Sequence, residues 1–381
     1  MVTTQPKRRV PELDGLRGIA ILLVLVFHYI SQGGTNTPGS VAAFLQRFVI
    51  MGWTGVDLFF VLSGFLIGGI LIDARESPNY FKAFYIRRFF RIIPIYYLWI
   101  LLYLGVIGAA GGQVARFSNS GNRPPINFGV FGHFLFLQNI IGYDLAGIAG
   151  AWFGHLWSLA VEEQFYLVAP LLVRFISSPV LKRILVTVIV AAPAFRLFLL
   201  WGLHVPAPRV TVLMPCRADA LAVGMLAATL TGSRDLLRMI REHSVLMHFA
   251  LALLTLGVVA LWMFAPQSST LGMQSLGYTW LAFFYATLLL LAVGQPESWA
   301  GRITRIAWLR ELGTVSYCVY IIHIAVNVVV HALLLRRAPS ISTGRGVVVT
   351  VLAAFVTYGV AKMSWVLFEG PLQRRGHAFK Y

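Results

Sequence analysis

The sequence predicts an all-α polytopic membrane protein with both termini in the cytoplasm. Of its 381 residues, 58% are hydrophobic and only 12% are charged, whereas soluble proteins have about 45–50% apolar and about 25% charged residues. Several stretches supply the roughly 20 apolar residues that a membrane helix needs. Lys and Arg gather in the segments that an even number of spans would leave on one side, and this bias sets both ends in the cytoplasm.

The apolar stretches predict a bundle of about ten transmembrane helices. They cover residues 15–33, 52–72, 92–110, 155–175, 184–202, 210–230, 246–264, 276–294, 312–334 and 347–368. The first stretch contains Arg and His and is followed by no clear cleavage site, which favours a retained helix over a signal peptide. The segment 128–142 is too short for a span, and we expect it to lie at the interface or to re-enter.

The remaining composition argues against several other classes of protein. The polar segment 111–127 is predicted to be an external loop, and no appended soluble domain is evident, so we expect residues 1–381 to form a single transmembrane domain. The net charge of +17 mostly sets orientation and does not indicate nucleic-acid binding. Cys216 and Cys318 fall within predicted helices and are interpreted as small buried hydrophobes, so neither a disulfide nor a metal site is expected.

The first predicted helix places Arg17 and His28 in an otherwise apolar run. The two are eleven residues apart, which is about 16 Å along a helix and about 20° from three full turns. Both side chains should therefore share one face, from the cytoplasmic end to beyond mid-depth. Since an unpaired charge is costly away from water, each needs a partner or a purpose; Asp14 is one candidate partner for Arg17.

Further polar side chains fall in the outer half of other predicted helices. They are Asp57, His155, Glu162, Tyr166, Arg217 and Asp219, with His323 nearer mid-depth. Intramembrane ionisable residues are functional candidates by default. We interpret His28 as the reactive group, with Asp57 or Glu162 orienting its ring and Arg217 stabilising negative charge. The alternative is a structural role, in which Arg217 and Asp219 neutralise each other or Glu162.

The stretch FYIRRFFRIIPIYY brings Arg87, Arg88 and Arg91 to the cytoplasmic start of the third predicted helix. Such a cluster is commonly an anchor that follows the positive-inside bias. Arg88 and Arg91 are also three residues apart on one helix face, so both could bind the oxygens of a phosphate group. A phosphate-bearing donor would favour this second interpretation.

Six stretches together resemble the membrane acyltransferase-3 family over almost the whole chain. They are LDGLRGIAILLVLVFH, GVDLFFVLSGFLI, RRFFRIIPIYY, HLWSLAVEEQFYL, SYCVYIIH and, more loosely, FEGPLQ. The resemblance implies ten membrane helices and transfer of an acyl group, usually acetyl, from cytoplasmic acyl-CoA to an acceptor hydroxyl. It places the family's Arg/His motif on Arg17 and His28, its arginine pair on Arg88 and Arg91, and its acidic motif on Glu162 and Glu163.

The resemblance also implies a bacterial cytoplasmic-membrane location and a range of acceptors. These include sugars of surface polysaccharides, lipopolysaccharide O-antigen, peptidoglycan and nodulation factors, as well as macrolide antibiotics. Some members carry an extracytoplasmic hydrolase-like domain; here that work would fall to the bundle or to a separate transferase partner. Direct transfer and an acyl-His or acyl-Tyr intermediate both stay open. The rival class is a transporter, whose polar residues would bind substrate or relay protons.

Overall fold

The structure, a computed structural model, describes residues 10–31, 39–110, 128–141, 147–231, 240 and 242–381. Throughout these segments the secondary structure is helical, without a strand, which confirms the predicted all-α fold. Eight of the helices are long and apolar enough to cross a membrane. The predicted external loop, 111–127, lies outside the described residues.

The eight long helices include several that are assembled from consecutive helical pieces. They are α1 (Pro11–Val26) with a π-helical end at Phe27–Ser31; α2 (Val41–Val49), continued through a 3₁₀ turn at Ile50–Thr54 into α3 (Gly55–Asp73); α4 (Tyr80–Ala110); α10 (Ser178–Leu197) with π-helical Phe198–Gly202; α14 (Ser244–Phe264); π-helical Met273–Gly277 with α15 (Tyr278–Gly294); α17 (Ala307–Leu335); and α18 (Gly344–Ser364), π-helical Trp365–Glu369 and α19 (Gly370–His377).

The other two predicted spans also form helices, at α9 (Trp157–Phe175) and α12 (Met214–Thr231). Both are less apolar than the eight, because α9 carries Glu162, Glu163 and Arg174 and α12 carries Arg217 and Asp219. Their crossing of the membrane stays a prediction. The short helices α11 (Ala207–Val212) and α16 (Trp299–Thr304) precede α12 and α17.

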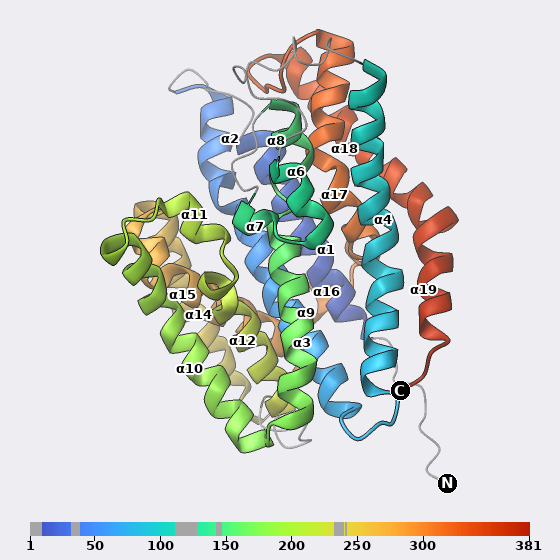
Figure 1. Ribbon diagram of the computed structural model, residues 1–381. Helices are drawn as coiled ribbons and strands as arrows, with labels where there is room; N and C mark the ends of the chain where they lie inside the picture. Colours follow the sequence, from blue (N-terminus) through green and yellow to red (C-terminus); the bar gives the residue numbers. More distant parts are fainter. Residues whose placement is uncertain (1–9, 32–38, 111–127, 142–146, 232–239, 241) are drawn as a thin grey trace.

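The segment 128–142 does not form a span, as expected. It folds into α6 (Phe128–Gly132), a 3₁₀ turn at His133–Leu135 and α7 (Gln138–Ile141), followed by α8 (Gly147–Phe153). Side chains of α4 hold it in place: the hydroxyl of Tyr96 donates to the carbonyl of His133, and that of Tyr97 donates to the carbonyl of Phe134. Figure 1 shows these short helices beside α9 and α4.

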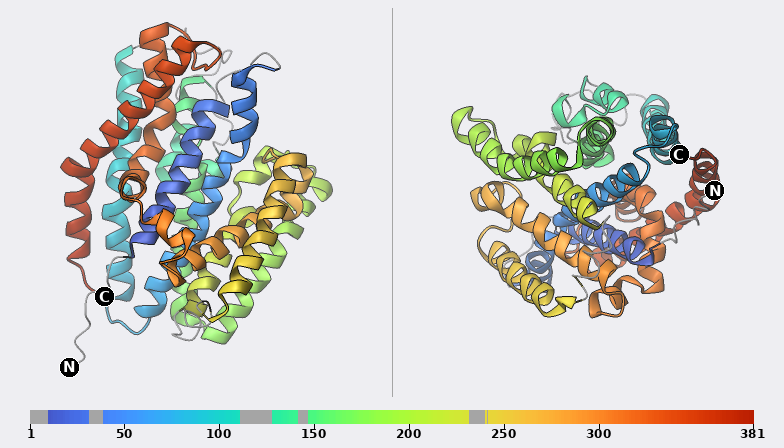
Figure 2. Two further views of the ribbon diagram at one scale, coloured as in Figure 1. Left: turned by 180° about the vertical axis from the view of Figure 1, so that it is seen from behind. Right: turned by 90° about the horizontal axis from the view of Figure 1, so that it is seen from below.

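Glycines allow the central helices to approach closely. A Cβ on Gly64 of α3 would overlap the carbonyl oxygen of Leu221 in α12, and a Cβ on Gly18 of α1 would overlap the carbonyl oxygen of Leu309 in α17. The interpretation of Gly64 and Gly68 as a helix-packing pattern is therefore confirmed. Seen from below, α1 and α3 run through the middle of the bundle (Figure 2).

The two ends of the chain lie at one end of the bundle, where α1 begins and α19 ends (Figure 1). This agrees with two termini on the same side, while the side itself stays a prediction. Cys216 and Cys318 are both buried and free, which confirms that they form no disulfide.

Candidate active site

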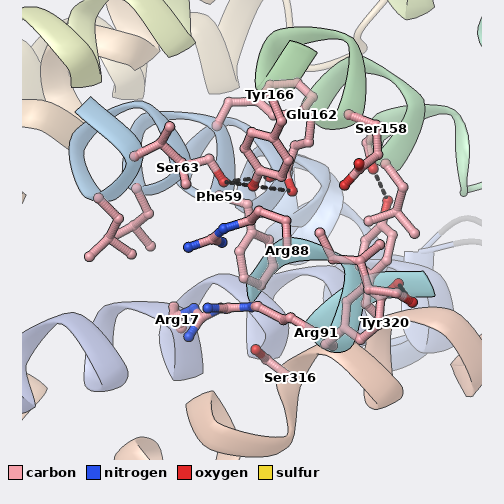
Figure 3. Close-up of a pocket in the computed structure, with 18 of the residues that line it drawn as sticks. Arg17, Phe59, Ser63, Arg88, Arg91, Ser158, Glu162, Tyr166, Ser316 and Tyr320 are labelled. Atoms are coloured by element: carbon pink, nitrogen blue, oxygen red, sulfur yellow. Dashed lines mark hydrogen bonds between the residues drawn. The ribbon is translucent and has the colours of Figure 1, made fainter. Parts of the chain in front are cut away.

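A polar pocket lies between α1, α3, α4, α9 and α17, and we call it the arginine pocket. Its cationic side chains are Arg17 from α1 and Arg88 and Arg91 from α4. Figure 3 shows the three guanidinium groups turned toward the same space. The empty volume, counted out to the opening, is about 900 Å³. The helix α4 begins at Tyr80, well before the predicted span, and so holds Arg88 and Arg91 on one regular helix face.

The three arginines have no counterion among the described residues. No hydrogen bond or ion pair joins Arg17, Arg88 or Arg91 to a side chain of that part of the chain, and Nε of Arg88 is buried without a partner. The guanidinium of Arg88 lies over the ring of Tyr166, 5.6 Å from its centroid. Three half-buried cations that lack acceptors suit a ligand with several anionic oxygens.

Two glutamates, Glu162 and Glu163, line the same pocket. Glu162 accepts a hydrogen bond from Ser63 at 2.8 Å and another from Tyr166 at 3.3 Å. These contacts fix the Glu162 carboxylate against α3, as the dashed lines in Figure 3 show. With three arginines against two carboxylates, the pocket carries a positive balance.

Two other predicted residues lie outside the arginine pocket. Nε of Arg87 donates to the carbonyl of Phe379 at 2.9 Å, and its guanidinium stacks over Tyr381 at 4.5 Å. Asp14 lines a separate pocket that includes Arg310. The sequence grouped Arg87 with Arg88 and Arg91 because they are neighbours, but a helix turns adjacent residues to different faces.

A second pocket, which we call the histidine pocket, lies further along α1, against α8, α9, α11, α12 and α17. It has an empty volume of about 1210 Å³. Its polar side chains include His28, His155 and Arg217. Its walls are largely aromatic, from Phe27, Trp53, Trp157, Tyr278 and Tyr320. An apolar pocket with a few converging polar groups is the usual form of a small-molecule site.

The hydrogen bonds of His28 fix its tautomer. Its ring lies in the π-helical segment Phe27–Ser31, and Nδ1 is 2.9 Å from the carbonyl of Val24 and 3.2 Å from Nε2 of His323. Nδ1 of His323 is 2.7 Å from the carbonyl of Tyr320. Carbonyls only accept, so each histidine carries its proton on Nδ1, an assignment that rests on the hydrogen-bond network. Neutral His28 then keeps the Nε2 lone pair for the pocket.

One side chain, Tyr320, separates the two pockets. Together with Val56 it lines both of them. Its hydroxyl is 2.6 Å from the hydroxyl of Ser158 and donates to the carbonyl of His155 at 2.8 Å. The wall between the arginine pocket and the histidine pocket is therefore about one side chain thick at this point.

Two buried Arg–Asp pairs flank the histidine pocket, and they differ in how completely they are satisfied. Arg217 donates to Asp57 at 2.5 Å, while Nε and Nη1 of Arg217 and Oδ2 of Asp57 are buried without partners in the described residues. The Arg217 guanidinium also stacks on Tyr278 at 3.7 Å. In the other pair, Arg196 is saturated. Its acceptors are the carbonyls of Cys216, Gln274 and Ser275 and the side chains of Asp219 and Thr279.

The structure thus distributes the predicted residues over two sites. Figure 3 shows Arg17, Arg88, Arg91, Glu162 and Tyr166 around the arginine pocket. The remaining predicted residues lie at or behind the histidine pocket: His28, His155 and Arg217 line it, whereas Asp57 and His323 contact those residues from behind. The sequence expected a carboxylate to orient His28; in the structure Val24 and His323 make the contacts to its ring.

Three functional neighbours escaped the sequence analysis. Arg196 is a fully buried cation in a predicted span, and the rule that singled out Arg217 would have found it. Ser63 and Ser158 gave no signal, because hydroxyl groups are common in membrane helices and only their contacts mark them.

Comparison with known proteins decides the family. A family model described as an acyltransferase domain matches residues 10–361. The chain belongs to this acyltransferase family. The resemblance predicted from its motifs is confirmed, and the all-helical fold with many apolar helices agrees with a multi-pass membrane acyltransferase. No solved structure matches the chain significantly.

Several curated bacterial members of the family are similar to the chain. It is 26% identical over 384 residues to the peptidoglycan O-acetyltransferase OatA of Listeria monocytogenes, and 27% identical over 387 residues to YrhL of Bacillus subtilis, which is provisionally named a peptidoglycan O-acetyltransferase. Each alignment covers 98% of this chain but only 57% and 56% of the relative. The chain therefore spans somewhat more than half the length of these two acyltransferases.

Proposed function

We propose that this chain is a membrane O-acyltransferase that moves an acyl group, in the first instance acetyl, from acyl-CoA to a hydroxyl of a glycan or lipid-linked sugar. The observation that carries the proposal is the meeting of two chemically different pockets at Tyr320 and Val56. One pocket is cationic, and the other presents a basic imidazole among aromatic walls. Membership of the acyltransferase family and the names of its relatives support this reaction.

The donor would bind at the arginine pocket. Arginine binds phosphate oxygens with paired, charge-assisted hydrogen bonds, and Arg17, Arg88 and Arg91 have no competing counterion among the described residues. The phosphates of acyl-CoA fit this donor set. Its thioester would then extend along α1 toward His28, a distance of about 16 Å from Arg17 for a straight helix.

The acceptor would enter the histidine pocket from the opposite side. Trp53, Trp157 and Tyr278 offer large apolar ring surfaces, against which the carbon framework of a sugar can pack. Acceptors from outside the cell require the arginine pocket to face the cytoplasm of a bacterial cytoplasmic membrane. Because the chain is shorter than its relatives, a separate extracytoplasmic transferase is a possible further partner.

In the simplest route, Nε2 of His28 takes the proton of the acceptor hydroxyl. The hydroxyl oxygen attacks the thioester carbonyl carbon, the carbon–sulfur bond breaks, and the CoA thiolate receives the proton. The unpaired N–H groups of Arg217 could stabilise the oxyanion that forms between these events. A covalent route would instead use the same Nε2 as the nucleophile.

The test replaces His28 with asparagine, whose amide can still donate to Val24 but has no Nε2. With radiolabelled acetyl-CoA and soluble peptidoglycan glycan strands, we expect transfer by membranes containing His28→Asn to fall at least ~100-fold, the usual contribution of a catalytic base. The matched control is His331→Asn: His331 is buried and its Nδ1 lies 3.0 Å from the carbonyl of Asn327, four residues back, but it lines neither pocket.

The control variant should keep near-normal transfer. Full transfer by His28→Asn would refute the assignment of His28. Membranes of the unmodified protein that release no CoA but accumulate a labelled solute would favour a transporter. Acetylation of a macrolide but not of glycan strands would keep the enzyme class and change only the acceptor.

A further inference from the structure

The histidine pocket contains a second basic nitrogen, on His155. This side chain is only 5% exposed and lines the pocket. Nε2 of His155 is 3.2 Å from the carbonyl of Ile321, so it carries the proton and donates it there. Nδ1 is buried and has no hydrogen-bond partner among the described residues. A buried acceptor left unpaired is costly, which suggests that a ligand completes it.

The rings of His28 and His155 face a common space. Their centroids are 6.3 Å apart and their planes are inclined by 63°. Nδ1 of His28 is already engaged with Val24 and His323, so Nε2 is the nitrogen that remains for substrate. Two lone pairs at this separation leave room for one reacting centre about 3 Å from each of them.

We propose that His155 is a second catalytic base and that it serves the acceptor half of a two-step transfer, with the acyl group held on His28 between the steps. The inference rests on the proposed function and deepens it. A single imidazole cannot be the nucleophile and the acceptor's base at once, so a covalent route requires a second base. The free Nδ1 of His155 supplies one in the same pocket.

In the first step, Nε2 of His28 attacks the thioester carbonyl carbon, the carbon–sulfur bond breaks, and CoA leaves as the thiolate. Acylation would leave the ring cationic unless Nδ1 lost its proton. Nε2 of His323, 3.2 Å away, is placed to receive that proton. The product is a neutral N-acetylimidazole on His28 beside a protonated His323.

In the second step, Nδ1 of His155 takes the proton of the acceptor hydroxyl. The hydroxyl oxygen attacks the acetyl carbon, and the bond from that carbon to Nε2 of His28 breaks. His28 recovers its Nδ1 proton from His323, and His155 releases its proton to solvent. The sum is one ester, one CoA thiolate and one proton, with every histidine restored.

The substitution His155→Gln isolates this role. A glutamine amide nitrogen can still donate to the carbonyl of Ile321, while the basic nitrogen is lost. The assay uses the full chain in membranes, radiolabelled acetyl-CoA and two acceptors: soluble peptidoglycan glycan strands and hydroxylamine. Hydroxylamine attacks through a neutral nitrogen and loses its proton afterwards, so it needs no base.

We expect His155→Gln to lose at least ~100-fold in transfer to glycan strands, to keep transfer to hydroxylamine within a few-fold, and to accumulate protein-bound label that hydroxylamine releases. His28→Asn should lose transfer to both acceptors. Equal losses with both acceptors in His155→Gln would indicate a merely structural role, and undiminished glycan transfer would exclude a base; either result overturns the inference alone. If the unmodified protein acetylates neither acceptor, the proposed function fails as well.

Discussion

At the scale of residues, the two buried Arg–Asp pairs show how the same ionic contact can serve different ends. All the donor groups of Arg196 are engaged, and Asp219 accepts from Arg196, Thr279 and the backbone of Ala220. Such a pair has nothing left for a ligand and stabilises the packing of α10 on α12. Arg217 keeps two unpaired N–H groups beside the histidine pocket. Removing a buried charge from water is costly, so the incomplete pair is the better candidate for chemistry.

The residue-scale prediction concerns the arginine pocket. Arg88→Gln should raise the KM for acetyl-CoA roughly 10-fold or more, because a charge-assisted hydrogen bond contributes about 1.5–3 kcal/mol. The measurement is the rate of CoA release at increasing acetyl-CoA in membranes. Arg87→Gln is the matched control from the same helix turn, since Arg87 is engaged by Phe379 and Tyr381 instead.

The KM of the Arg87→Gln variant should stay within about twofold of the unmodified protein, as is typical of a residue remote from the ligand. Equal increases in both variants would mean that Arg87 binds the donor too, as its place in the sequence suggested. No change in Arg88→Gln would show that the phosphates bind elsewhere.

At the scale of elements, α17 connects the two pockets. Ser316 and Tyr317 face the arginine pocket, Tyr320 lies in the shared wall, and His323 contacts His28. Spacings of three and four residues keep Ser316, Tyr320 and His323 on one side of the helix. A rigid helix therefore sets the separation between the proposed donor and acceptor sites, more reproducibly than loops would.

The element-scale prediction tests the packing of α3 on α12. Gly64→Ala should lower the free energy of unfolding by about 1–3 kcal/mol, since the new methyl group would overlap the backbone of Leu221. The measurement is the thermal denaturation midpoint in detergent. Gly69→Ala in the same helix is the control: no atom lies within 4 Å of the position its Cβ would take.

Alanine has the higher helix propensity, so Gly69→Ala should leave the midpoint unchanged or raise it slightly. If Gly64→Ala is as stable as Gly69→Ala, the close approach of α3 and α12 is wrong.

At the scale of the whole molecule, the orientation in the membrane can be tested with single cysteines. The connection between α3 and α4 and the connection between α17 and α18 lie at opposite ends of the bundle (Figure 1). Glu76, whose side chain is 88% exposed, lies in the first, and the exposed Ser342 lies in the second. In intact cells, an impermeant thiol reagent should label Ser342→Cys but not Glu76→Cys, according to the positive-inside bias.

The unmodified protein is its own control, because Cys216 and Cys318 are buried and should give little background. Permeabilised cells should allow labelling of Glu76→Cys. The reverse pattern in intact cells would invert the orientation, and the arginine pocket could then no longer face cytoplasmic acyl-CoA.

The sequence anticipated much of the fold, because long apolar runs in a bilayer leave few alternatives to helices. It also selected most of the charged residues around the pockets, since an ionisable group in such a run stands out. It could not anticipate the π-helical turn that carries His28, which depends on local hydrogen bonding. Nor could it pair Asp219 with Arg196, because the partners of a side chain follow from how distant helices pack.

The thin wall at Tyr320 has a consequence for the cell as a whole. A bacterium that modified outside sugars by exporting an activated donor would lose a costly carrier with each event, and an open passage would dissipate its ion gradients. A barrier about one side chain thick, braced by Ser158 and the backbone of His155, lets a two-carbon unit change hands while nucleotide and ions stay on their own sides. Under the proposed reaction, the membrane remains sealed throughout the catalytic cycle.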